Sequence, residues 1–103
     1  MASPQLEKGY TKIANELLEA TAGNITNSTW LRVVLLTIRL TYGWNRKEVQ
    51  SNYGAYATKL HLTKETIRGA ILEMADRKIL KYLPITRESF IISICKNYEL
   101  WKI

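Results

Sequence analysis

Cysteine is almost missing from this sequence, and so is any long hydrophobic run. Cys95 is the only cysteine among 103 residues, which excludes an intrachain disulfide and leaves no cysteine cluster for a metal. The longest apolar stretch, "VVLL", is far too short to cross a bilayer, and the opening "MASPQLEKGY" lacks the apolar core of a signal peptide. We therefore expect a protein of the reducing cytoplasm, without membrane contact.

Groups of residues that catalyse reactions are missing too. The chain has no paired carboxylates, no glycine-rich phosphate loop and no nucleophile placed beside a base. His61 is the only histidine, and no metal-ligating residues cluster around it, which favours a surface position over a catalytic or metal-binding one. We expect a protein that is not an enzyme and that needs neither a cofactor nor a metal.

The chain has many apolar and basic residues. Hydrophobic residues make up 47%, enough for one core, so residues 1–103 are expected to form a single domain. The formal net charge is +6, and the first 23 residues contribute −1 to it, with two bases against three acids. The basic surplus therefore lies in the last eighty residues, which suggests a polyanionic partner.

The first half of the chain predicts an arm followed by two helices. Residues 1–13 read as an extended arm, which a short strand at 10–13 could close. The first helix is expected at 14–21, burying Ile13, Leu17 and Leu18 and stopping at Gly23. A second helix at 29–42 is apolar around most of its girth, which is typical of a central helix.

The second half predicts two more helices and a hairpin. The third helix is expected to start at Tyr53 or Gly54 and to end near Leu60, and the fourth to span 64–78 with Thr63 as its cap. Two β-prone runs then predict a wing hairpin at 80–94 with its tip at 86–88. The tail is expected to pack Tyr98, Leu100 and Trp101 on the domain. A strand at Val49 is expected to be weak or absent, because the stretch around it lacks apolar alternation.

This order predicts a mainly α fold with a small β-hairpin, a winged helix-turn-helix. The fourth helix supports it with a stripe of Ile67, Ala70, Ile71 and Met74, spaced as one buried face. On the third helix Ala57 and Leu60 would face inward, and Leu62 would fill the turn. His61 then falls where positive φ is often needed, a conformation that histidine tolerates at a cost on the order of 1 kcal/mol.

The chain resembles a known family in three stretches: "MASPQLEKGYTKIANELLEA", "TYGWNRKE" and "KNYELWK". They are similar to the amino-terminal domain of phage replication protein O, and the resemblance covers nearly the whole chain. It implies a winged helix that binds double-stranded DNA at repeated sites of a phage or prophage replication origin, as a homodimer. It also implies recruitment of the host helicase or its loader, through a region that we expect to lie outside this chain.

The fourth helix is the candidate for the major groove. Arg68 can fork onto guanine, Thr66 can meet a thymine methyl or a phosphate, and Glu65 can accept from cytosine or simply stabilise the first helical turn. Arg68 and Lys64 have an alternative interpretation as a solvated helix face. The expected DNA-binding residues are Lys64, Glu65, Thr66, Arg68 and Gly69 in the helix, with Arg46, Lys47, Lys59, Lys81 and Arg87 on phosphates. About five phosphate contacts predict a slope of log affinity against log salt of about −4 to −5.

Two other functions stay open from the sequence. Winged helices also serve as transcriptional regulators, and the sequence does not separate that role from replication initiation. The aromatic residues, Trp44 above all, could instead stack on the bases of a single strand, although we expect most of them to be packing residues. Leu72, an apolar residue on the outer face of the fourth helix, could dock a replication partner.

Overall fold

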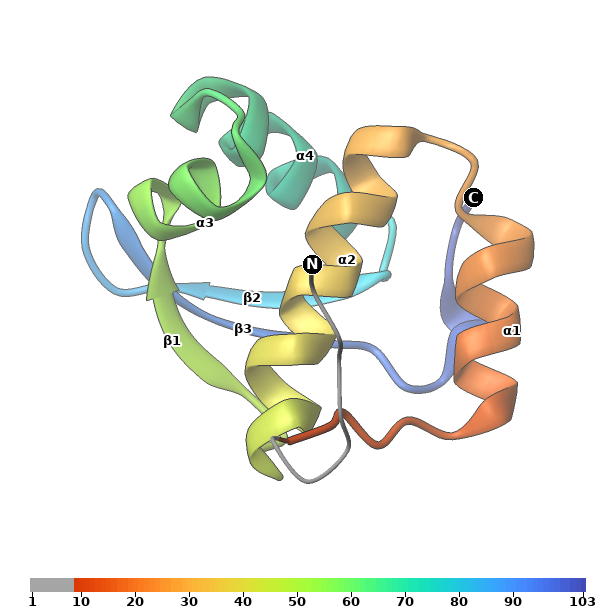
Figure 1. Ribbon diagram of the computed structural model, residues 1–103. Coiled ribbons are helices and arrows are strands. Elements are labelled where there is room, and N and C mark those ends of the chain that lie inside the picture. The colour runs from red at the N-terminus through yellow and green to blue at the C-terminus, as the bar shows by residue number, and fades with distance from the viewer. Residues whose placement is uncertain (1–8) are drawn as a thin grey trace.

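The computed structural model describes residues 9–103 and confirms the mainly α fold with a β wing (Figure 1). Residues 9–14 are extended and form no strand, so the expected strand at 10–13 is wrong, and residues 1–8 of the expected arm lie outside the described part. The elements, in chain order, are α1 (Asn15–Asn24), α2 (Ser28–Thr41), η2 (Tyr42–Trp44), β1 (Val49–Asn52), α3 (Tyr53–Leu60), α4 (Lys64–Asp76), β2 (Leu80–Pro84), β3 (Ser89–Ile94) and η3 (Tyr98–Leu100).

Three of the four α-helices begin with a polar side chain that accepts from the helix backbone. Asn27 accepts from the Trp30 amide at 3.1 Å, and Asn52 accepts from the Ala55 amide at 2.7 Å. Thr63 accepts from the Thr66 amide at 3.2 Å, as expected for the cap of α4. These contacts satisfy amides that the first helical turn leaves without an internal partner, and they fix where α2, α3 and α4 start.

Two helix ends differ from the sequence-based boundaries. The first helix continues through Gly23 to Asn24, because glycine weakens a helix without stopping it and the Ile25 amide still reaches the Thr21 carbonyl at 3.2 Å. The fourth helix ends at Asp76, and Lys78 then turns the chain with a φ of 64°. Leu18 is exposed, contrary to expectation, because α1 presents only its Leu17 side to the core.

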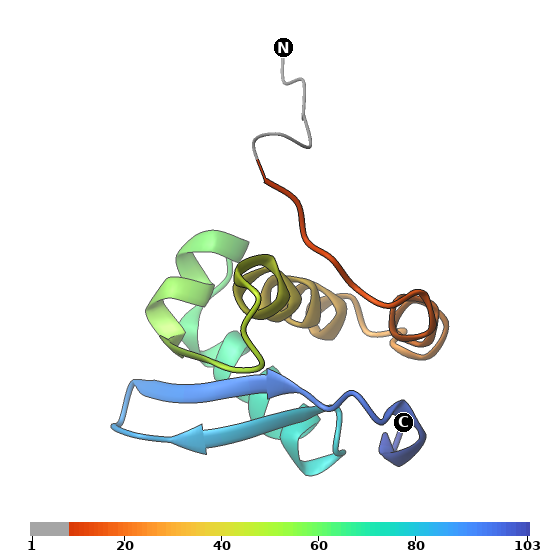
Figure 2. The ribbon, with the colours of Figure 1, turned by 90° about the horizontal axis from the view of Figure 1, so that it is seen from below.

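The wing is a three-stranded antiparallel sheet with the order β1-β3-β2. The β2–β3 hairpin is as expected, but β1 is a complete strand and pairs Val49 with Ile92 and Asn52 with Ser89. Backbone groups make this pairing, so it forms although only Val49 among the four side chains of β1 is apolar. Figure 2 shows the hairpin along one side of the molecule, with α1, α2 and α3 on the other side of it.

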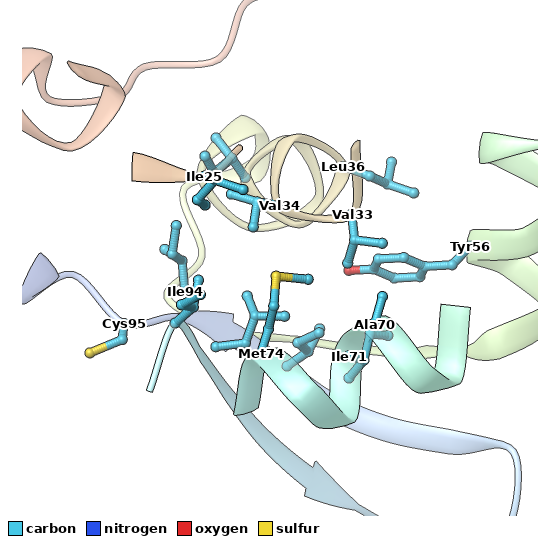
Figure 3. Packing of buried hydrophobic residues seen from close by; sticks show 14 of the residues in the cluster. Ile25, Val33, Val34, Leu36, Tyr56, Ala70, Ile71, Met74, Ile94 and Cys95 are labelled. Atoms are coloured by element: carbon cyan, nitrogen blue, oxygen red, sulfur yellow. The ribbon is translucent and has the colours of Figure 1, made fainter. Parts of the chain in front are cut away.

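The core lies between α2, α4 and the sheet. Val33 and Val34 on α2 face Ile71 and Met74 on α4, and all four are fully buried (Figure 3). The helix α2 is central, as expected, but it is buried around less of its circumference than expected. Leu35 is exposed on the same outer side as Arg32 and Arg39. The expected stripe of α4 is confirmed.

The turn between α3 and α4 has the expected left-handed residue. His61 has φ 57° and ψ 44°, and the amide of Leu62 donates to the carbonyl of Ala57 at 3.0 Å. The guanidinium of Arg32 donates to the carbonyl of Leu60, which would otherwise lack a partner at the helix end. The C-terminal end of α3 is therefore tied to α2, and this fixes the direction in which α4 leaves.

The tail packs through one large side chain. Trp101 is buried, and its indole Nε1 donates to the carbonyl of Cys95 at 2.9 Å. Tyr98 is half-buried and meets Trp101 edge to face. Leu100 is exposed, contrary to expectation, because the short helix η3 turns it away from the domain.

Candidate nucleic-acid interface

The outer face of α4 is open to solvent. Glu65, Arg68, Gly69 and Leu72 are all exposed, opposite the buried stripe of the same helix. A Cβ atom added at Gly69 would meet no atom of the surrounding structure within 4 Å. Within residues 9–103 neither the tail nor the hairpin covers this face, so the described part of the chain leaves it open to a large ligand.

The first turn of α4 lies beside the tip of the wing. Lys64 Nζ is 3.6 Å from Glu88 Oε2, and both side chains are more than half exposed. A cleft of about 450 Å³ separates the two elements, and it is lined by Tyr53, Lys64, Glu65, Arg68, Arg87 and Glu88. The fold thus places four of the expected site residues around one hollow, three from α4 and Arg87 from the wing.

Tyr53 forms the floor of this cleft and was not expected there. Its hydroxyl is 2.6 Å from the hydroxyl of Tyr82, and its ring centroid is 4.9 Å from that of Phe90. Burial first, and then the Tyr82 hydroxyl, raise the pKa of the Tyr53 phenol to about 12, although the nearby Arg68 guanidinium opposes the rise. The phenol is therefore neutral at physiological pH, and it lines the same cleft as Arg68.

Glu88 is the second residue of the cleft that the sequence did not indicate. It stands at the hairpin tip, next to Arg87 in the sequence and beside Lys64 in space, where its charge would oppose an approaching phosphate. A single acidic residue in a predicted turn does not by itself indicate a binding site. Only the antiparallel register, which brings Ser89 opposite Asn52 and so places the tip beside the start of α3, reveals the contact with Lys64.

Thr66 has a structural role as well as the expected one. Its hydroxyl is 2.9 Å from the hydroxyl of Thr63, so it shares in the cap that starts α4. Lys59 lies in the last turn of α3 and is exposed. Neither residue lines the cleft, but both lie close in sequence to the turn that joins α3 to α4.

Three expected phosphate contacts lie elsewhere. Arg46 and Lys47 precede β1, whose first residue pairs with Ile92, and Lys81 pairs with Ser93. All three are therefore near the end of β3 that is remote from the wing tip. A strand rises about 3.3 Å per residue, so the two ends of β3 are roughly 17 Å apart. The structure separates these bases from the cleft.

None of the helices within residues 9–103 combines the length and the apolarity that crossing a bilayer requires. The described elements form a helix-turn-helix unit, α3 and α4, with a β wing beside its second helix. This element order is typical of a winged helix-turn-helix, and the cleft between the wing and its second helix is lined by three basic and two acidic side chains.

The chain belongs to the bacteriophage replication protein O family, and the family model matches residues 3–101. Replication protein 15 of Enterobacteria phage phi80 is 32% identical over 76 residues, which are 73% of this chain and 25% of that protein. Replication protein O of Escherichia phage lambda is 30% identical over 76 residues, 74% of this chain and 23% of that protein. The chain thus matches about a quarter of each relative's length. No solved structure matches it.

Proposed function

We propose that this domain binds double-stranded DNA of defined sequence at a phage or prophage replication origin and acts there as an initiator module. The observation that carries the proposal is the exposed face of α4 with Arg68 beside the wing. The major groove admits an α-helix, and the family gives the setting of replication. The role is one of binding and not of catalysis.

In this proposal Arg68 reads the base edges. A guanidinium can donate twice to O6 and N7 of guanine, which is worth about 1–3 kcal/mol of discrimination. Glu65, one turn nearer the start of α4, accepts from cytosine N4 on a neighbouring pair. Gly69 lets the helix backbone approach the groove, since nothing projects from it.

The remaining bases near α4 hold the phosphates. Lys64 exchanges its exposed contact with Glu88 for a phosphate, while Arg87 reaches the backbone from the wing and Lys59 reaches it from α3. Because Arg46, Lys47 and Lys81 lie at the far end of the sheet, three phosphate contacts replace the five expected from the sequence. The slope of log affinity against log salt then becomes about −3.

The family setting extends the proposal beyond this domain. Relatives of four times the matched length leave room for a region that recruits the host helicase or its loader. We propose that two copies of the domain bind each origin repeat, in the cytoplasm of the host cell. Both proposals rest on the family and not on a contact within the described residues.

Selection of bound duplexes from a random pool tests the function, followed by affinity measurements on the selected site. We expect Arg68→Ala to weaken that affinity by about five-fold or more and to relax the preference at one base pair. Arg68→Lys keeps the positive charge but loses the bidentate contact to guanine. It should therefore keep the affinity for random duplexes and lose the preference at that base pair. An Arg68→Ala protein with full affinity and selectivity would refute the assignment of α4.

A further inference from the structure

Two exposed aromatic residues stand at the end of the domain remote from α4. Tyr10 is 67% exposed and Trp44 is 61% exposed, and both line a hollow of about 320 Å³ together with Arg39. They are the most exposed aromatic side chains of residues 9–103. Aromatic rings that remain in water add little to the hydrophobic stabilisation of the isolated domain.

The hollow is held in shape by the turn that follows α2. Arg46 donates its amide to the Thr41 carbonyl at 2.8 Å, and Arg39 places its guanidinium carbon 5.4 Å from the Trp44 ring centroid. A side chain at Gly43 would come within 2.6 Å of the Arg39 Nη1 atom and 3.1 Å of the Thr11 hydroxyl. The arm and the turn therefore meet closely at Gly43, where an added Cβ would force the end of the Arg39 side chain to move.

A second hollow, of about 220 Å³, is lined by the same two stretches of chain and by Lys96. Its lining includes four bases and no acid: Lys12, Arg46, Lys47 and Lys96, with Tyr42 and Asn45. Neither of the two ion pairs recorded in residues 9–103 involves any of these four bases. Lys96 Nζ stands 5.8 Å from the Tyr42 ring centroid. The hollow therefore concentrates four positive charges that no ion pair within residues 9–103 neutralises.

We propose that this face, from Tyr10 and Trp44 to Arg46, Lys47 and Lys96, binds single-stranded DNA. Bases would stack on the two rings while the phosphates that follow them reach the basic hollow, the combination that single-strand sites use. A duplex fits this surface poorly, because its bases already cover one another and expose no ring face. The aromatic side chains thus select single-stranded over double-stranded DNA, and the lysine and arginine side chains supply the affinity.

The position of this face gives it a use at an origin. The basic hollow lies near the end of β3 that is remote from the wing tip, so α4 and this hollow can be occupied together. The domain would hold a duplex site with α4 and one separated strand with the opposite end. This use rests on the proposed duplex binding, whereas the single-strand site itself does not.

The experiment measures binding of a fluorescent oligothymidylate of about fifteen nucleotides and, in parallel, binding of the duplex selected above. We expect Trp44→Ala to weaken single-strand binding by about five-fold or more, and Trp44→Phe to retain most of it. Arg46→Ser with Lys47→Ser should weaken it further and flatten its dependence on salt. Lys102→Ser and Leu18→Ala, exposed positions outside both hollows, are the matched controls and should change nothing.

The duplex arm separates this inference from the proposed function. Loss of single-strand binding in Trp44→Ala with unchanged duplex affinity supports the site, and it does so even if Arg68→Ala has no effect on duplexes. Single-strand binding that survives Trp44→Ala, or that is lost in Arg68→Ala, would overturn it. Equal losses of duplex and single-strand affinity in the Arg46 and Lys47 variant would overturn it too. Tighter binding of oligouridylate than of oligothymidylate would overturn the assignment to DNA.

Discussion

Lys64 in the first turn of α4 and Glu88 at the wing tip form an ion pair with 3.6 Å between Nζ and Oε2. Both residues line the cleft, and Glu88 places a negative charge where the proposed DNA backbone approaches. Both side chains are well exposed, so the pair adds at most about 1 kcal/mol to stability. Its charge matters more for binding than for folding.

Glu88→Gln should therefore strengthen duplex binding and leave the unfolding free energy nearly unchanged. The substitution removes repulsion of the phosphates and releases Lys64 to contact them, which predicts a gain of a few fold at low salt that shrinks as salt is added. Titration of the selected duplex at several salt concentrations checks it. Glu99→Gln removes the same charge from η3 and should have a smaller effect; equal gains for both variants would show that only net charge matters.

Replacement of His61 should stabilise the domain. His61→Gly removes the cost of a side chain at φ 57°, and the greater freedom of glycine in the unfolded chain cancels part of the gain. We expect a net increase of roughly 0.5–1 kcal/mol in the urea unfolding free energy. His61→Asn should be close to neutral and His61→Val destabilising, because a β-branched residue tolerates this conformation least. A destabilised glycine variant would point to a contact of the imidazole that the exposed position does not suggest.

The buried pair of Thr37 and Tyr56 should respond unequally to removal of either hydroxyl. The two oxygens are 2.7 Å apart, and Thr37 also hydrogen-bonds the Val33 carbonyl at 2.9 Å. Tyr56→Phe leaves Thr37 with that second partner, whereas Thr37→Val leaves a buried phenol with none. We expect a loss of about 1 kcal/mol for the first variant and about 1–3 kcal/mol for the second. Comparison with the double variant by urea unfolding isolates the coupling between them.

Stability should fall at high pH through the buried tyrosines. Burial raises the pKa of Tyr56 from 10.0 to about 12, although Thr37 opposes the rise. Below pH 10 the phenol is neutral in both states and its contribution is complete. Between pH 10 and 12 the unfolded state ionises first, so the contribution is lost as pH rises. The unfolding free energy of Tyr56→Phe should therefore decline less steeply across this range than that of the wild type; parallel curves would contradict the assigned burial effect.

The sequence predicted the helices and turns that have a periodic apolar pattern or a capping residue. It did not predict features that depend on backbone pairing between strands or on the register of residues far apart in the chain. The stripe of α4 and the turn at His61 follow from local rules that operate within a few residues. The strand β1 has no such stripe, because its hydrogen bonds to β3 do not depend on side-chain type. The contact between Lys64 and Glu88 joins residues far apart in sequence, so no local pattern announces it.

The candidate site divides in the same way. Arg68, Lys64 and Glu65 were indicated by their position on the helix, while Tyr53 was missed because its role arises from the packing of α3 on the wing. Arg46, Lys47 and Lys81 were grouped with them on charge alone. The charge of a residue does not show on which side of the fold it lies. The sheet register places these three at the other end of the domain.

Gly69 offers a test that separates stability from binding at the face of α4. It lies within the helix, where glycine is less favourable than alanine by about 1 kcal/mol, and a Cβ atom added there meets no atom of the surrounding structure within 4 Å. Gly69→Ala should therefore raise the unfolding free energy by about that amount. Gly69→Phe should fold as well as the wild type and yet bind the selected duplex at least about ten-fold more weakly, because its ring would hold the helix away from the base edges that Arg68 must reach. Urea unfolding and duplex titration of the same two variants measure both effects. A phenylalanine variant with unchanged duplex affinity would mean that the groove does not approach this face, and the site would then have to be sought away from α4.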